Sequence, residues 1–159
     1  MSVAFRKEED AEAEAANLPD RPVSTHPNLV TPDGLAAIEA ALAEAQGAYA
    51  AAQGAADISA DRTAMARATR DLRYWSQRRA TAQLIERTED LSKAAFGHAV
   101  TIEREDGRTS TYRIVGEDEA DPAKGSISYV SPMAQALLGK SVGDEAVVAG
   151  HGVEILAVR

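Results

Sequence analysis

The stretch that decides the fold of the first half is TPDGLAAIEAALAEAQGAYAAA, residues 31–52. Its apolar residues recur at alternating spacings of three and four, a pattern typical of a helix that buries one narrow stripe against a second helix. Thr31 suits the N-cap position and Pro32 the first helical position. The stripe consists of Leu35, Ile38, Leu42, Ala45, Tyr49 and Ala52. We therefore predict an amphipathic helix from residue 31 to about residue 55.

A second amphipathic helix is predicted directly after the first. Apolar residues recur at the same spacing from Met65 to Trp75, and Asp61 lies where a negative charge suits the dipole of a helix start. Two such helices joined by a short polar turn form an antiparallel hairpin. We assign residues 31–92 to this coiled-coil hairpin, with its tip near residues 55–61.

The chain before the hairpin is predicted to be a flexible tail. Residues 1–30 contain Pro19, Pro22 and Pro27, which interrupt any helix, and the segment has few apolar residues to bury.

The chain after the hairpin changes to strand patterning. Apolar and polar residues alternate, Asp106-Gly107 indicates a tight turn, and Ser131-Pro132 indicates the start of a short helix that Gly139 ends. We predict that residues 93–159 form an α+β domain with an antiparallel sheet of four or five strands and one short helix. The expected strands are residues 98–104, 111–115, 126–130, 145–149 and 153–158.

Composition excludes several kinds of protein. The chain of 159 residues has no cysteine, which excludes disulfides, thiolate metal sites and a cysteine nucleophile. No stretch approaches the roughly 18 apolar residues of a membrane span, and the charged N-terminus has no signal-peptide core. We expect a cytoplasmic protein that does not enter a membrane.

The charge of the chain is unevenly distributed. The formal net charge is −8, yet residues 62–79 contain six arginines and a single acidic residue, Asp71. An acidic protein with one arginine-rich helix is not a general binder of duplex DNA, but that helix suits an acidic partner or a phosphate backbone. An ordinary solvated helix face explains the arginines equally well.

The second domain carries an ordered series of motifs. These are YRIVGEDEAD (residues 112–121), ISYVSPMA (127–134), ALLGK (136–140) and VGD (142–144). Together they resemble the C-terminal domain of the Gre transcript-cleavage factors of bacterial RNA polymerase, over residues 96–159. The layout of the two predicted helices is also similar to that family.

The resemblance implies an FKBP-like C-terminal domain that docks at the rim of the polymerase secondary channel, while the hairpin enters the channel. In the family, acidic tip residues help to hold the second magnesium ion at the polymerase active site, and the polymerase then cleaves its backtracked RNA. The resemblance therefore implies an accessory factor, not an enzyme, with RNA polymerase and the nascent RNA 3′ end as partners. We expect a monomer with no cofactor of its own.

Carried over by position, the resemblance implies three groups of functional residues. The metal group consists of Asp57 and Asp61, which share the polymerase magnesium. The RNA or channel contacts are Arg62, Arg67, Arg70 and Arg73. The polymerase-binding residues are Ser131, Pro132, Met133, Gly139 and Lys140.

The tip departs from the family pattern. That pattern is Asp-Leu-Ser-Glu-Asn-Ala, whereas residues 57–62 read DISADR, so the family glutamate falls on Ala60. Asp61 lies about 100° round the helix from the lost carboxylate. Each helix of the hairpin is also about two turns shorter than in the usual family members, which shortens the reach of the tip by on the order of 10 Å. Helix capping by Asp57 and Asp61 is the alternative to metal binding.

Three functions stay open at this point. The first is a Gre-type factor that stimulates transcript cleavage, and the second is a channel-binding regulator or inhibitor that does not. The third, remote alternative is a prolyl isomerase of FKBP-like fold. The aromatic residues of the second domain, Phe96, Tyr112 and Tyr129, are too few for the aromatic-lined pocket of such an enzyme.

Overall fold

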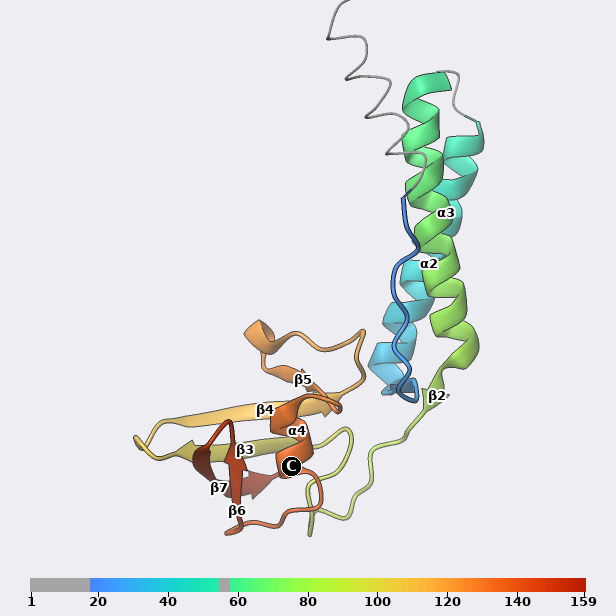
Figure 1. Ribbon diagram of the computed structural model, residues 1–159. Helices are drawn as coiled ribbons and strands as arrows, with labels where there is room; N and C mark the ends of the chain where they lie inside the picture. Colours follow the sequence, from blue (N-terminus) through green and yellow to red (C-terminus); the bar gives the residue numbers. More distant parts are fainter. Residues whose placement is uncertain (1–17, 55–57) are drawn as a thin grey trace, which may run out of the picture. The chain divides into compact units, whose positions relative to one another are not determined.

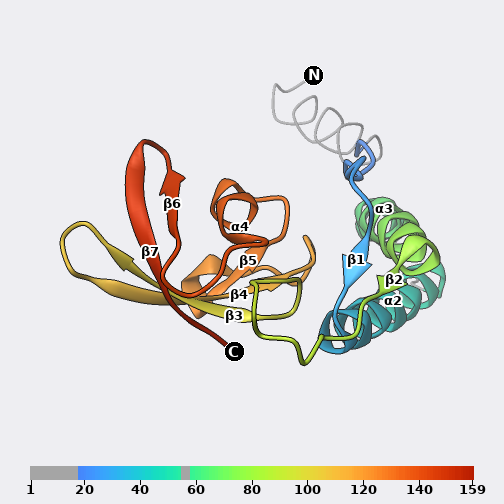
Figure 2. The same ribbon diagram turned by 90° about the horizontal axis from the view of Figure 1, so that it is seen from below.

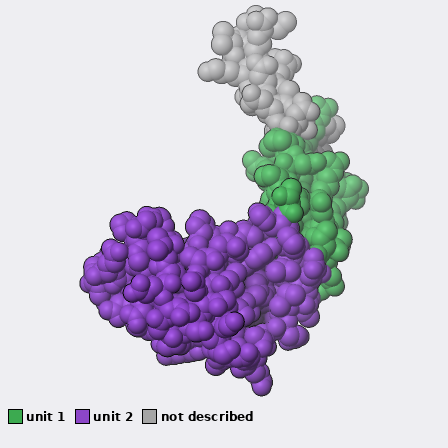
Figure 3. Space-filling model, turned by 60° about the horizontal axis from the view of Figure 1, so that its bottom comes forward, with its two compact units in different colours: residues 1–25, 38–81 green, residues 26–37, 82–159 purple. Residues whose placement is uncertain are grey.

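The computed structural model describes residues 18–54 and 58–159 (Figure 1). The chain forms two compact units, which we call the helical unit (residues 1–25 and 38–81) and the sheet unit (residues 26–37 and 82–159) (Figure 3). The divisions fall at other points than the expected residues 30 and 92, because the segments before and after the hairpin pack with the sheet.

The helical unit contains most of the predicted hairpin, whose first helix begins in the sheet unit. Helix α2 (Pro32–Gln53) and helix α3 (Ile58–Thr81) lie side by side in both views (Figures 1 and 2), which confirms the expected pair. Ala45, Ala52 and Ala68 are buried, and their small side chains let the two backbones approach closely. None of the described helices is both long and apolar enough to cross a membrane.

The sheet unit contains a five-stranded sheet with the strand order β5-β4-β3-β7-β6 and one short helix, α4 (Pro132–Leu137). The fold class expected from the sequence is thus confirmed. The strands are β3 (Ala99–Arg104), β4 (Thr109–Val115), β5 (Ser126–Ser128), β6 (Glu145–Val148) and β7 (His151–Val158).

The sheet is mixed, which corrects the expectation of a purely antiparallel one. Strand β5 runs parallel to β4, with Arg113 opposite Ser126, while the other neighbouring pairs are antiparallel. The connection between them contains a 3-10 turn (Pro122–Lys124) and returns the chain to the level of Arg113 before pairing begins. That return makes the two strands parallel.

The core of the sheet unit lies between one face of the sheet and α4. Alternate residues of the strands point into it, as the period of two predicts, so that Val100, Ile102 and Ile155 are fully buried. Leu137 and Ala134 of α4 cover them from the other side and are equally buried.

A second, two-stranded sheet was not expected. Strand β1 (Leu29–Val30) pairs in parallel with β2 (Gln83–Leu84), so the segment before α2 lies beside the segment after α3. The backbone N–H of Gln83 donates to the Asn28 carbonyl at 2.8 Å. Strands of two residues carry no periodicity, and the sequence pattern therefore does not reveal them.

Gly116 allows this small sheet to lie against the main one. A Cβ atom at this position would lie 2.3 Å from the Leu29 carbonyl oxygen, closer than any real contact. The glycine is thus required by the close approach of two backbones.

We expect Gly116→Ala to lower the free energy of unfolding by about 1–3 kcal/mol, because the added methyl group forces β1 away from the sheet. Gly47→Ala is the matched control, since nothing lies within 4 Å of its added Cβ. Alanine in a helix interior is favoured over glycine by roughly 0.5–1 kcal/mol, so the control should raise stability. Urea unfolding measures both, and an unchanged Gly116→Ala protein would contradict the packing described.

Candidate functional site

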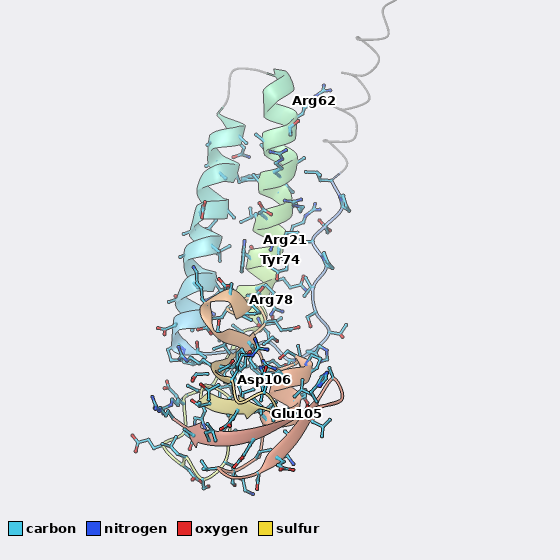
Figure 4. The ribbon with its side chains drawn as sticks, turned by 90° about the vertical axis from the view of Figure 1, so that its left-hand side faces the viewer. Arg21, Arg62, Tyr74, Arg78, Glu105 and Asp106 are labelled. Carbon is cyan, nitrogen blue, oxygen red and sulfur yellow. The ribbon has the colours of Figure 1, made fainter. Side chains whose placement is uncertain are left out.

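The four arginines predicted to contact RNA or the channel all lie on α3. Arg62 projects from the second turn of the helix, near the tip (Figure 4), and Arg67 is exposed one turn further on. Among the residues that the structure describes, neither has an ion-pair partner. These two guanidinium groups are therefore presented to solvent.

The other two arginines are engaged within the chain. Arg70 lies 3.4 Å from the Asp71 carboxylate, and Arg73 lies 3.2 Å from the carboxylate of Asp20. The four predicted arginines thus fall into two groups. The two nearer the tip are exposed to solvent, and the two further along α3 form ion pairs with aspartates of the chain.

Arg78 takes no part in this surface. It belongs to the arginine-rich stretch by sequence, but only 2% of it is exposed, which makes it the largest fully buried side chain described. A buried guanidinium is a structural element of the helix end and not a contact for an outside partner. Its neighbour Arg79 pairs with Glu39 at 2.9 Å and joins α3 to α2.

The predicted metal residues cannot be placed. Asp57 lies outside the described residues, and only the helical backbone of Asp61 is described. Within the described part of the chain, no group of three or more histidine, aspartate or glutamate side chains is arranged to hold a metal ion.

The predicted polymerase-binding residues gather at the two ends of α4. Ser131 is the N-cap, as predicted: its Oγ accepts a hydrogen bond from the Ala134 backbone N–H at 3.2 Å. Pro132 occupies the first turn and is exposed, while Met133 is partly buried against the core. The cap therefore fixes the direction in which this end of the helix leaves the sheet.

At the other end of α4, backbone hydrogen bonds hold the chain against Ala94, which lies in the segment between β2 and β3. Gly139 has a φ of 80°, its N–H donates to the Ala94 carbonyl, and the Ala94 N–H donates to the Lys140 carbonyl, both at 2.8 Å. Because its backbone is fixed, the Lys140 side chain is presented from a rigid support.

The start of α2 is held by a buried polar contact, which we call the Thr31–Glu119 clamp. The Thr31 hydroxyl accepts from the Gly34 N–H at 3.0 Å and donates to the Glu119 carboxylate at 2.6 Å. Thr31 is 1% exposed. The carboxylate lies at the positive end of the helix dipole, where a negative charge is stabilised. Thr31 was predicted as a cap, but Glu119 is 88 residues away and carries no local signal.

A second feature missed from the sequence lies along α3. The N-terminal strap, residues 18–25, belongs to the helical unit although the sequence predicts a tail there. The Arg21 guanidinium lies 3.9 Å from the centre of the Tyr74 ring and 3.5 Å from the Asp71 carboxylate (Figure 4). The strap residues show no periodicity, so only the folded structure reveals what they contact.

The aromatic residues of the sheet unit have structural partners. Phe96 packs edge-on against Tyr129 at 5.9 Å, and the Tyr112 hydroxyl accepts from Arg104 at 2.9 Å. Two surface cavities of 280 and 380 Å³ lie beside the hairpin turns, and neither is lined by an aromatic ring. These two cavities therefore do not provide the aromatic-lined pocket that the prolyl isomerase alternative requires.

The family model and the similar curated proteins described below are all GreA/GreB transcription elongation factors. Residues 89–159 match the family described as transcription elongation factor, GreA/GreB, C-term. Transcription elongation factor GreA of Desulfovibrio desulfuricans is 47% identical over 92 residues, which cover 56% of this chain and 55% of that protein. Transcription elongation factor GreB of Pasteurella multocida is 44% identical over 77 residues, which cover 48% of this chain and 49% of that protein.

The chain spans about half the length of the curated relatives it matches. Among solved structures, the crystal structure of GreA factor homolog 1 from Thermus thermophilus aligns with 84% of this chain and 99% of that chain. The sequence identity is 19% and the TM-score is 0.40.

We expect Thr31→Ala to lower the free energy of unfolding by about 0.5–2 kcal/mol, because it removes the N-cap of α2 and the donor to Glu119. Thr31→Ser keeps the hydroxyl and should retain most of that stability. Urea unfolding of the full chain compares the two variants. Equal losses in both would show that the methyl group of Thr31, and not its hydroxyl, stabilises this junction.

Proposed function

We propose that this chain is a transcription elongation factor of the GreA/GreB family and binds bacterial RNA polymerase, because its residues 89–159 match the C-terminal domain of that family. The sheet unit is the docking part, and the helical hairpin is the part that enters the secondary channel. The observation that carries the proposal is the family match over residues 89–159, which falls within the sheet unit.

The proposed role is that of an accessory factor in the bacterial cytoplasm. Hydrolysis of RNA requires a metal ion that polarises the phosphate and activates water, and the polymerase supplies both metal and active site. This chain contributes side chains that position the RNA or that modulate the backtracked elongation complex.

The two ends of α4 provide the docking residues. Pro132 and Lys140 are held on capped and hydrogen-bonded backbone, so little conformational entropy is lost when a partner binds them. Lys140 adds a positive charge to an otherwise apolar contact, and it suits an acidic group on the polymerase.

Arg62 and Arg67 are the best-placed RNA contacts. They lie nearest the tip and have no ion-pair partner among the described residues. A phosphate that enters beside the tip would find two guanidinium groups able to donate hydrogen bonds to it.

Occupation of the channel without strong cleavage is the second candidate function, and the tip sequence favours it. Ala60 stands where the family has a glutamate, and magnesium demands near-ideal octahedral placement of its ligands. The 22 residues of α2 span about 33 Å, so the reach of the tip is also limited.

We expect Lys140→Glu to weaken the binding of polymerase by the full chain by about tenfold, because the reversed charge opposes the acidic partner. Lys124→Glu is the matched control: it makes the same change on the same unit, at a side chain that is 84% exposed. Surface plasmon resonance with immobilised polymerase measures both affinities. Equal affinities for the two variants would remove the α4 region from the interface.

For transcript cleavage, we expect the natural chain to release few or no 3′ RNA fragments from a backtracked complex with magnesium. Asp57→Ala should abolish any residual release, and Ala60→Glu should increase it if the arms reach the active site. Gel analysis of end-labelled RNA gives the rates. Strong cleavage by the natural chain, lost in Asp57→Ala, would reject the non-cleaving candidate.

A further inference from the structure

The contacts of the N-terminal strap with α3 are of two kinds. One is a stacked contact, in which the planar Arg21 guanidinium lies over the Tyr74 ring and 5.2 Å from the Trp75 ring centre. The other is a pair of carboxylate–guanidinium contacts: Arg21 with Asp71, and Asp20 with Arg73. The strap therefore places a planar group on an aromatic ring and an anion on an arginine.

Single-stranded nucleic acid makes the same two kinds of contact with proteins. Its bases stack on exposed aromatic rings, and its phosphates pair with arginine side chains along a basic groove. On α3, the ring of Tyr74 lies one residue from Arg73 and one turn from Arg70, so that a stacking surface and guanidinium donors occur together. The strap occupies this combination with a planar guanidinium on the ring, in the place of a base, and a carboxylate on Arg73, in the place of a phosphate.

The strap is held by contacts that a polyanion can displace. The Asp20–Arg73 pair is about two-thirds exposed on both sides, and exposed ion pairs contribute little stability and are screened by salt. Pro19 and Pro22 restrict the backbone on both sides of the contact residues, which lowers the entropy lost when the strap is seated. The strap is therefore easily seated and easily released.

We propose that the N-terminal strap is an autoinhibitory contact, which covers a surface of Tyr74, Trp75 and Arg73 and must leave before single-stranded RNA binds there. This inference rests on the proposed function, since it assigns a regulation to the arginine face of α3. In the seated state, Arg62 and Arg67 are the arginines of α3 that have no ion-pair partner among the described residues. In the released state, the basic surface extends along the helix and gains an aromatic ring.

The decisive variant is Arg21→Ala in the full chain. The substitution removes a positive charge, so simple electrostatics predicts weaker RNA binding. Release of the strap predicts tighter binding, by about two- to fivefold, the effect of losing one exposed cation–π contact. Fluorescence anisotropy with a labelled 12-residue oligouridylate measures the dissociation constant.

Two controls accompany this variant. Arg108→Ala removes the same charge from a side chain that is 79% exposed on the β3–β4 turn, and should leave binding unchanged or slightly weaker. Adding Tyr74→Ala to Arg21→Ala should cancel the gain, because the released surface then lacks its ring. Asp20→Asn provides a second release variant that keeps Arg21.

The emission of Trp75 gives an independent readout. It is the only tryptophan in the chain, and Arg21 lies beside its ring. We expect oligouridylate to change this emission at lower concentrations in Arg21→Ala than in the natural chain.

The proposal would be overturned if Arg21→Ala bound RNA no more tightly than the natural chain while its circular dichroism was unaltered. It would also be overturned if neither the natural chain nor Arg21→Ala bound the oligonucleotide. Polymerase binding through the sheet unit is measured separately on the same variants. Loss of polymerase binding by the natural chain would reject the proposed function, whereas RNA binding alone decides the role of the strap.

Discussion

The hydrogen bond from the Thr31 hydroxyl to the Glu119 carboxylate is the contact on which the start of the hairpin depends. Its Thr31 end is buried, the same hydroxyl caps α2 by accepting from the Gly34 N–H, and the bond joins the start of that helix to the loop that follows β4. Strand β1 lies directly before it in the chain, and Gly116 admits that strand against the main sheet. Helix α2 therefore begins inside the sheet unit, and the rest of it belongs to the helical unit.

Sequence patterns predict those parts of the fold that repeat over several turns or strands. The apolar stripe of α2, the alternation in β3 and β7, and the Ser131 cap of α4 are all local signals, and each is confirmed. The parallel pairing of β5, the small β1–β2 sheet and the Glu119 clamp depend on contacts between distant segments, which no local pattern encodes. For the candidate site, the sequence indicates an arginine-rich helix but not that Arg78 is buried and Arg73 paired.

The ion pairs within the helical unit show which arginines of α3 are engaged by the chain itself, which the composition of the helix does not. Arginines near the tip face solvent, whereas those further along α3 contact acidic groups of the chain itself. In a protein of net charge −8, the arginines of α3 that have no ion-pair partner among the described residues, Arg62 and Arg67, therefore lie toward the N-terminal end of that helix. The proposed docking residues and the proposed RNA contacts thus lie on different units of the chain, the sheet unit and the helical unit.

Site-specific crosslinking tests most directly whether the sheet unit contacts the polymerase and the hairpin contacts the RNA. A photoreactive residue is placed at position 62 or at position 133 of the full chain, which is then bound to a backtracked elongation complex with labelled RNA. The account predicts that position 133 crosslinks to a polymerase subunit and that position 62 crosslinks to the 3′ segment of the RNA. Crosslinking of position 133 to RNA, or of neither position to its expected partner, would contradict it.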